Sequence, residues 1–169
     1  MYTWEGLIQF VRHLPYGRNA NRKDLKLVSF EKKGNCSSKH ALLKRVADAN
    51  NIADVQLILG IYKMNHLNTP NIGNVLIEKS IDFIPEAHCY LKINGERTDI
   101  TSHQSNFKNL QKDIVQELEI QAEQVAEFKV NYHKDFLRKW ILENKMQIGF
   151  DEIWQIREKC ISNLTLASK

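Results

Sequence analysis

The sequence predicts an α+β fold, in which helices pack on an antiparallel sheet, and three observations support this. Residues 54–64 are a run of branched apolar side chains typical of a strand. Further along, an Asn-Gly dipeptide lies between alternating polar and apolar residues, the strongest short-range signal for a β-hairpin. Before and after these strands, apolar residues recur three and four positions apart, as in amphipathic helices.

The elements before the hairpin follow from local signals. Thr3 can cap a first helix, whose apolar stripe ends at Pro15, where a polar loop opens. The expected order is a helix over residues 4–14, an ambiguous segment at 25–30, a helix from Cys36 to about 48, the strand at 54–64 and a second ambiguous segment at 75–84.

Two helices are expected after the hairpin, over residues 122–145 and 150–164, with Asp151 capping the second. Lys129 and His133 fall one turn apart inside the broad apolar arc of the first helix. A snorkelling lysine and a satisfied core histidine would explain the pair structurally. The alternative is that this helix flanks an active cleft and contributes His133 to it.

Composition and charge narrow the possible functions of the chain. No long linker divides its 169 residues, so we expect one domain, with a core at about 1–104 and a helical part at about 105–169 packed on it. The net charge of +4 is spread over scattered Lys and Arg residues, so no nucleic-acid partner is expected. The N-terminal segment lacks the apolar core of a signal peptide, and no apolar run could span a membrane. The three cysteines show no C-x-x-C pair or metal spacing, which favours a cytoplasmic location.

Residues 87–101, AHCYLKINGERTDIT, form the predicted hairpin. A two-residue type I′ turn at its Asn-Gly pairs Leu91 with Thr98 and sets the parity of both strands. One face is then apolar and should cover a core, whereas the polar face should look into a cleft. His88 and Asp99 lie on the polar face as diagonal neighbours, whose Cβ atoms are about 7 Å apart in such hairpins. A carboxylate at that position can bind the imidazole.

Cys36 stands at the point where a loop becomes a helix. A thiol there lies at the positive end of the helix dipole, which favours the thiolate. Free backbone N–H groups at the same helix end can hold an oxyanion. A nucleophilic cysteine also needs a base and a group that orients the base. Cys36, His88 and Asp99 can fill these three roles.

These residues resemble the transglutaminase-like superfamily, a branch of the papain-like cysteine fold, over roughly residues 30–101. The matching motifs are GNCSSKHALL and AHCYLKINGERTDIT. Residue by residue, Cys36 matches the nucleophile, His88 the base and Asp99 the orienting carboxylate. The chain departs from the family at Cys89, where an aromatic residue is common, and at Thr98, where a tryptophan is common. It resembles a small bacterial-type member rather than a protein-crosslinking enzyme.

The resemblance implies acyl transfer through a thioester, without a metal or organic cofactor. The substrate would be a small-molecule or peptide amide or ester; water as acceptor would make the protein a hydrolase, and an amine would make it a transferase. The sequence does not choose between these acceptors, and it leaves the oligomeric state open. A catalytically silent interaction domain with the same fold is the alternative function. A weak nucleic-acid binder is a second rival.

Four further residues are candidates for substrate or oxyanion contacts. Tyr16 and Arg18 precede the nucleophile, where a hydroxyl could support an oxyanion and a guanidinium could pair with a carboxylate; a polar loop is the structural alternative. His40 lies one turn after Cys36 and could contact the thiol, but no further ligands are spaced for a metal site. His133 is the fourth candidate.

Overall fold

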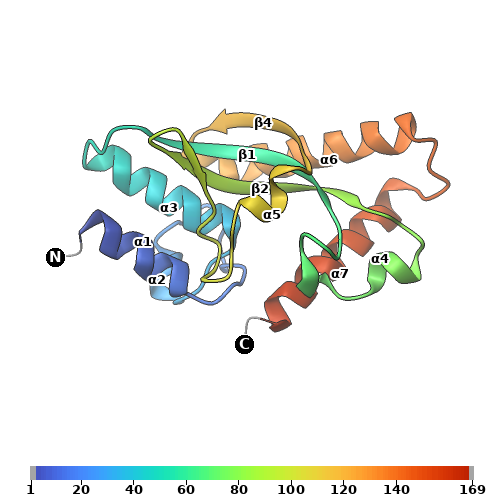
Figure 1. The fold of residues 1–169 in the computed structure, drawn as a ribbon, viewed down its shortest axis with the longest axis horizontal. Coiled ribbons are helices and arrows are strands. Elements are labelled where there is room, and N and C mark those ends of the chain that lie inside the picture. The colour runs from blue at the N-terminus through green and yellow to red at the C-terminus, as the bar shows by residue number, and fades with distance from the viewer. Residues whose placement is uncertain (1–2, 168–169) are drawn as a thin grey trace.

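The computed structural model describes residues 3–167 and has an α+β fold around one antiparallel sheet (Figure 1). In chain order, the helices and 3₁₀ turns are α1 (Trp4–His13), α2 (Leu27–Phe30), α3 (Cys36–Ala49), η1 (Pro70–Ile72), α4 (Val75–Glu78), α5 (Lys108–Gln111), η2 (Ala122–Val125), α6 (Glu127–Glu143) and α7 (Phe150–Ala167). The strands are β1 (Val55–Met64), β2 (Ile84–Ile93), β3 (Glu96–Thr98) and β4 (Ile114–Ile120).

The four strands lie in the order β3-β2-β1-β4, and each neighbouring pair is antiparallel. The strand β4 was not among the predicted elements. Its sequence, IVQELEI, alternates apolar and polar residues only in part, and it forms a largely exposed edge strand. This weak alternation explains why the sequence did not predict the strand.

The predicted hairpin is confirmed over its turn. Asn94 and Gly95 both have positive φ values, 50° and 82°, and Leu91 pairs with Thr98. The expected continuation of the pairing to Asp99 is wrong, because β3 ends at Thr98 and the chain turns toward α3. As a result β3 pairs only with the last three residues of β2, and in the described part of the chain no strand covers the rest of that edge.

The helices pack on the sheet at several places. The helix α3 contacts β1 and β2, α6 contacts β2, and α7 contacts η1 and β2 (Figure 1). Between α3 and the sheet lies a core of fully buried aliphatic residues that includes Leu43, Leu57, Leu59 and Leu91. No helix within residues 3–167 combines the length and apolarity that crossing a membrane requires.

Two of the expected helices differ from the sequence-based expectations. The helix expected at 122–145 divides into η2 and α6, because Ala126 between them has non-helical dihedral angles. The last helix starts at Phe150, so Asp151 lies in its first turn instead of capping it. Both ambiguous segments contain a single helical turn, α2 and α4.

Candidate active site

The loop before α3 positions Cys36 as the first residue of the helix. The Asn35 side chain accepts a hydrogen bond from the Ser38 backbone N–H at 3.0 Å, and Ser38 Oγ accepts one from the Asn35 N–H at 3.1 Å. This reciprocal capping box fixes the helix start. Gly34 allows the loop to approach the helix, since a Cβ there would lie 2.8 Å from Lys39 Cγ. The glycine of the GNC motif is therefore required by packing.

The first turn of α3 also offers free donors. Within residues 3–167, no group accepts a hydrogen bond from the backbone N–H of Cys36 or Ser37. These two N–H groups lie beside the sulfur at the positive end of the helix. They are suited to hold an oxyanion.

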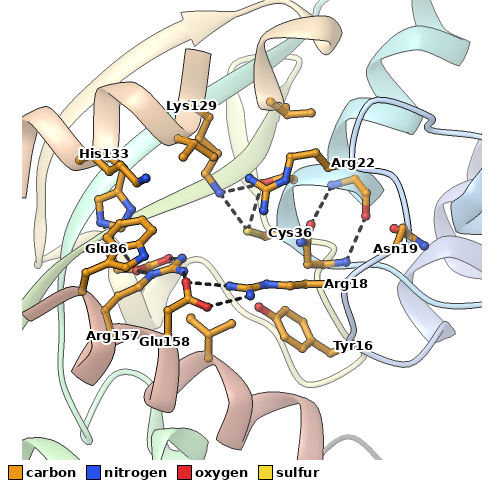
Figure 2. A pocket seen from close by; sticks show the side chains of 18 residues that line it. Tyr16, Arg18, Asn19, Arg22, Cys36, Glu86, Lys129, His133, Arg157 and Glu158 are labelled. Carbon is orange, nitrogen blue, oxygen red and sulfur yellow. Dashed lines mark hydrogen bonds and ion pairs between the residues drawn. The ribbon is translucent and has the colours of Figure 1, made fainter. Parts of the chain in front are cut away.

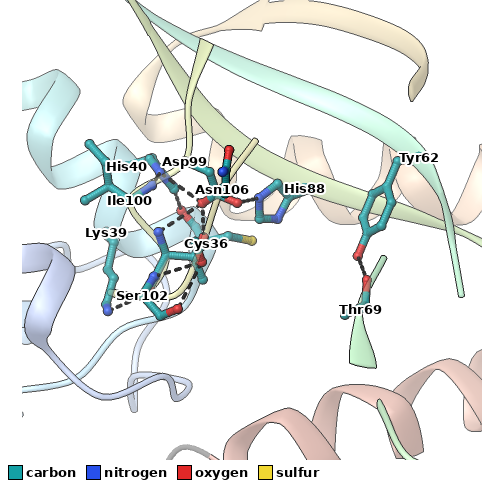
Figure 3. A network of polar contacts seen from close by, with 12 residues as sticks. Cys36, Lys39, His40, Tyr62, Thr69, His88, Asp99, Ile100, Ser102 and Asn106 are labelled. Atoms are coloured by element: carbon teal, nitrogen blue, oxygen red, sulfur yellow. Dashed lines mark hydrogen bonds and ion pairs between the residues drawn. The ribbon is translucent and has the colours of Figure 1, made fainter. Parts of the chain in front are cut away.

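His88 and Asp99 meet as expected, although the strand pairing of the hairpin ends one residue before Asp99. His88 Nε2 lies 2.9 Å from Asp99 Oδ2. The other Asp99 oxygen, Oδ1, accepts hydrogen bonds from the Thr101 N–H at 2.9 Å and the Thr101 hydroxyl at 2.6 Å. Burial alone would raise the pKa of Asp99, but His88 and these hydrogen bonds hold it well below its usual range. The carboxylate therefore keeps Nε2 protonated and leaves Nδ1 for the thiol (Figure 3).

The Cys36 thiol is set for ionisation at neutral pH. Burial would raise its pKa, but the charges of Lys129 and His88, together with hydrogen bonding from His88 and the Cys89 backbone, lower it to about 6. Burial would lower the pKa of His88, but Asp99 and Cys36 raise it to about 10. Between these two values the resting pair is a thiolate and an imidazolium.

Lys129 is a close neighbour of the Cys36 thiol that the sequence did not reveal. Its Nζ lies 3.7 Å from Cys36 Sγ and donates a hydrogen bond to Ser37 Oγ at 2.6 Å (Figure 2). Burial would lower the pKa of this ammonium group, but the nearby Cys36 keeps it raised. The only sequence signal was a charged residue in an apolar arc, which does not reveal the partner 93 positions away.

His40 is fully buried in the first turns of α3. Its Nε2 accepts a hydrogen bond from the Ile100 N–H at 2.7 Å, so the proton is on Nδ1, which donates to the Cys36 carbonyl oxygen at 2.6 Å. Burial lowers its pKa to about 4, so the ring is neutral. Neither ring nitrogen is available to a substrate. His40 is a positioning residue that ties the start of α3 to the segment after Asp99 (Figure 3).

Lys39 makes a parallel connection. Its buried Nζ donates hydrogen bonds to the Leu14 carbonyl oxygen at 2.5 Å and the Thr101 carbonyl oxygen at 2.7 Å. The ends of α1 and of the hairpin are thereby held against the first turn of α3. Burial lowers the pKa of Lys39 to about 8.

A cavity of about 400 Å³ opens beside the sulfur (Figure 2). Its wall combines residues of the 15–22 loop, the start of α3, β2, η2, α6 and α7. They are Tyr16, Arg18, Asn19, Arg22, Asn35, Cys36, Ser37, Ser38, Glu86, Val125, Lys129, Val130, His133, Lys134, Trp154, Arg157, Glu158 and Ile161. Three of the four predicted contact residues, Tyr16, Arg18 and His133, belong to this wall, and His40 does not.

Two of these three side chains already bind other groups. Arg18 forms a two-point ion pair with Glu158 at 2.8 and 3.0 Å, and His133 Nε2 lies 2.8 Å from the Pro85 carbonyl oxygen. The Tyr16 hydroxyl has no hydrogen-bond partner among the described residues, and burial holds its pKa well above the usual range. Tyr16 is therefore a neutral donor at the cavity wall.

Comparison with protein-family models, curated proteins and solved structures finds no match to this chain. Residues 3–167 also contain no group of three or more His, Cys, Asp or Glu side chains that could hold a metal ion.

Proposed function

We propose that the protein is a cysteine-nucleophile acyl-transfer enzyme with a papain-like core of the transglutaminase-like type. One observation carries this proposal. Cys36 begins a capped helix at a cavity wall, its thiol interacts electrostatically with His88, and His88 Nε2 lies 2.9 Å from the buried Asp99 carboxylate. Nucleophile, base and orienting group are thus in the arrangement that covalent catalysis needs.

The reaction begins with attack of the Cys36 thiolate on the carbonyl carbon of an amide or ester. The carbonyl oxygen becomes an oxyanion, which the N–H groups of Cys36 and Ser37 stabilise. His88 then gives its Nδ1 proton to the leaving amine or alcohol, and a thioester remains on Cys36. In the second half His88 removes a proton from water or an acceptor amine, which attacks the thioester and releases the thiolate.

Lys129 supports the resting thiolate rather than transferring protons. Its ammonium group remains charged, because Cys36 raises its pKa. The thiolate therefore has two cations next to it, Lys129 and the protonated His88. Since all three cysteines are free thiols, the enzyme would act in a reducing compartment such as the cytoplasm.

Intact-protein mass spectrometry after a low dose of iodoacetamide at pH 7 tests the proposal. Cys36 is expected to label rapidly, because it is a thiolate at a cavity wall. Cys89 and Cys160 should label slowly, since both are fully buried and burial raises the pKa of each to about 11. Unfolded protein, in which all three label alike, is the control. Uniformly slow labelling of the folded protein would instead favour a catalytically silent interaction domain.

A further inference from the structure

We propose that the cavity beside Cys36 selects an acyl group that carries a carboxylate, and that Arg22 is the main residue that binds it. This inference rests on the proposed function and specifies its substrate class. The cavity volume of about 400 Å³ lies at the small end of the range for small-molecule sites, which suits a short acyl chain.

The cavity wall has an excess of positive charge. Five Lys and Arg side chains line it, against two carboxylates, Glu86 and Glu158. Arg157 donates two hydrogen bonds to the Glu86 carboxylate, at 2.7 and 2.5 Å, and one to the Glu158 carboxylate at 2.6 Å. Arg18 binds the same Glu158. Both carboxylates are therefore already neutralised.

Three cations of the wall remain without a carboxylate. Lys129 faces the thiolate, and Lys134 Nζ lies 5.1 Å from the centre of the Trp154 ring. Arg22 has neither a hydrogen bond nor an ion pair within residues 3–167, and Figure 2 shows its side chain reaching over the cavity. Arg22 is an exposed residue, but partial burial and the neighbouring guanidinium groups of Arg18 and Arg157 lower its pKa, and the charge of Glu158 offsets only part of this effect.

A carboxylate would relieve the repulsion between these guanidinium groups. The planar guanidinium of Arg22 can bind it through two hydrogen bonds. The need for an anion increases in the acyl-enzyme, because the thioester no longer carries the charge that faces Lys129 in the resting state. Apolar residues of the same wall, among them Val130 and Ile161, can contact the methylene groups of the acyl chain.

Alkylation of Cys36 by iodoacetate and by iodoacetamide tests this inference. The two reagents are alike except that iodoacetate carries a carboxylate where iodoacetamide carries a neutral amide. The ratio of their rates at Cys36, divided by the same ratio for 2-mercaptoethanol, measures the preference for an anion. We expect this preference to be about tenfold at low ionic strength and to fall as salt is added. In Arg22→Gln this preference, measured as the ratio of the two rates, should fall severalfold.

Lys23→Gln is the matched control. It removes the same charge at the next position, from a side chain that pairs with Glu127 at 2.5 Å and does not line the cavity. The preference should be unaffected in this variant. The inference is overturned if the parent shows no preference, if Arg22→Gln keeps it, or if both variants lose it equally. Slow alkylation by the neutral reagent would be a different result, since it would contradict the proposed function itself.

Discussion

A His88→Asn variant is expected to alkylate with iodoacetamide at Cys36 about tenfold more slowly than the parent near pH 6, and at least as fast as the parent near pH 9. The pKa of Cys36 is about 6 in the parent, so half of the thiol is ionised at that pH. Without the imidazolium its pKa should climb toward the free value of about 8.5. Near pH 6 the fraction of Cys36 that is ionised should fall by more than tenfold. The more basic thiolate of the variant is a better nucleophile, which offsets part of this loss in rate.

The measurement is a full pH–rate profile of Cys36 alkylation. His103→Asn is the control, because this exposed histidine lies outside the cavity wall. Its profile should overlay that of the parent. A Lys129→Met variant should also shift the profile to higher pH, since the Lys129 charge is the largest of the influences that lower the pKa of Cys36. An unshifted His88→Asn profile would show that His88 is not the partner of the thiol.

Replacing Arg157 with Met is expected to lower the free energy of unfolding at pH 7 by about 3–5 kcal/mol. The guanidinium forms two hydrogen bonds with Glu86, and only 10% and 6% of the two side chains are exposed. The variant would leave the Glu86 carboxylate buried beside His133 without its main partner. Urea denaturation measures this loss of stability.

Two further variants test whether the loss of stability in Arg157→Met comes from the unpaired buried charge. Arg18→Met breaks the ion pair with Glu158, whose partners are 44% and 34% exposed, and should lower stability by at most about 1 kcal/mol. Combining Arg157→Met with Glu86→Leu should recover most of the loss, because no buried charge is then left unpaired. Equal losses in Arg157→Met and Arg18→Met would contradict the buried-pair interpretation.

The pH dependence of this loss follows from Glu86. Burial would raise the pKa of this carboxyl group, but Arg157 and His133 lower it to about 2. The pair therefore contributes its full stability above about pH 4.5, where the unfolded carboxyl is ionised, and loses it as pH falls through the folded pKa. In Arg157→Met the buried Glu86 takes up a proton more readily. The difference between parent and variant should shrink as pH falls from about 5 to about 3.

Local features of the fold could be predicted because short segments specify them. The Asn94-Gly95 turn demands positive φ at both positions, and this sets the parity of His88 and Asp99. The start of α3 is likewise specified by its cap at Asn35. Asp99 lies just beyond β3, yet it still meets His88. The Ile100 N–H binds His40 and the Thr101 N–H binds the Asp99 carboxylate, and these hydrogen bonds hold the segment in place.

Features that depend on distant contacts could not be predicted. Lys129 reaches Cys36 only because α6 packs on β2, and sequence spacing carries no sign of that approach. The cavity combines the 15–22 loop with α6 and α7 for the same reason. His40 shared the expected helix face with the thiol, but its hydrogen bond from Ile100, 60 positions later, turns it into a structural link.

The central claim is that Cys36 rests as a thiolate beside a protonated His88. Titration of thiolate ultraviolet absorbance, as the difference between the parent and Cys36→Ser, tests it most directly. Cys89 and Cys160, with pKa values of about 11, do not ionise in the relevant range. The expected midpoint of the difference titration is a pH of about 6. A midpoint at or above the free thiol value of about 8.5 would contradict the claim.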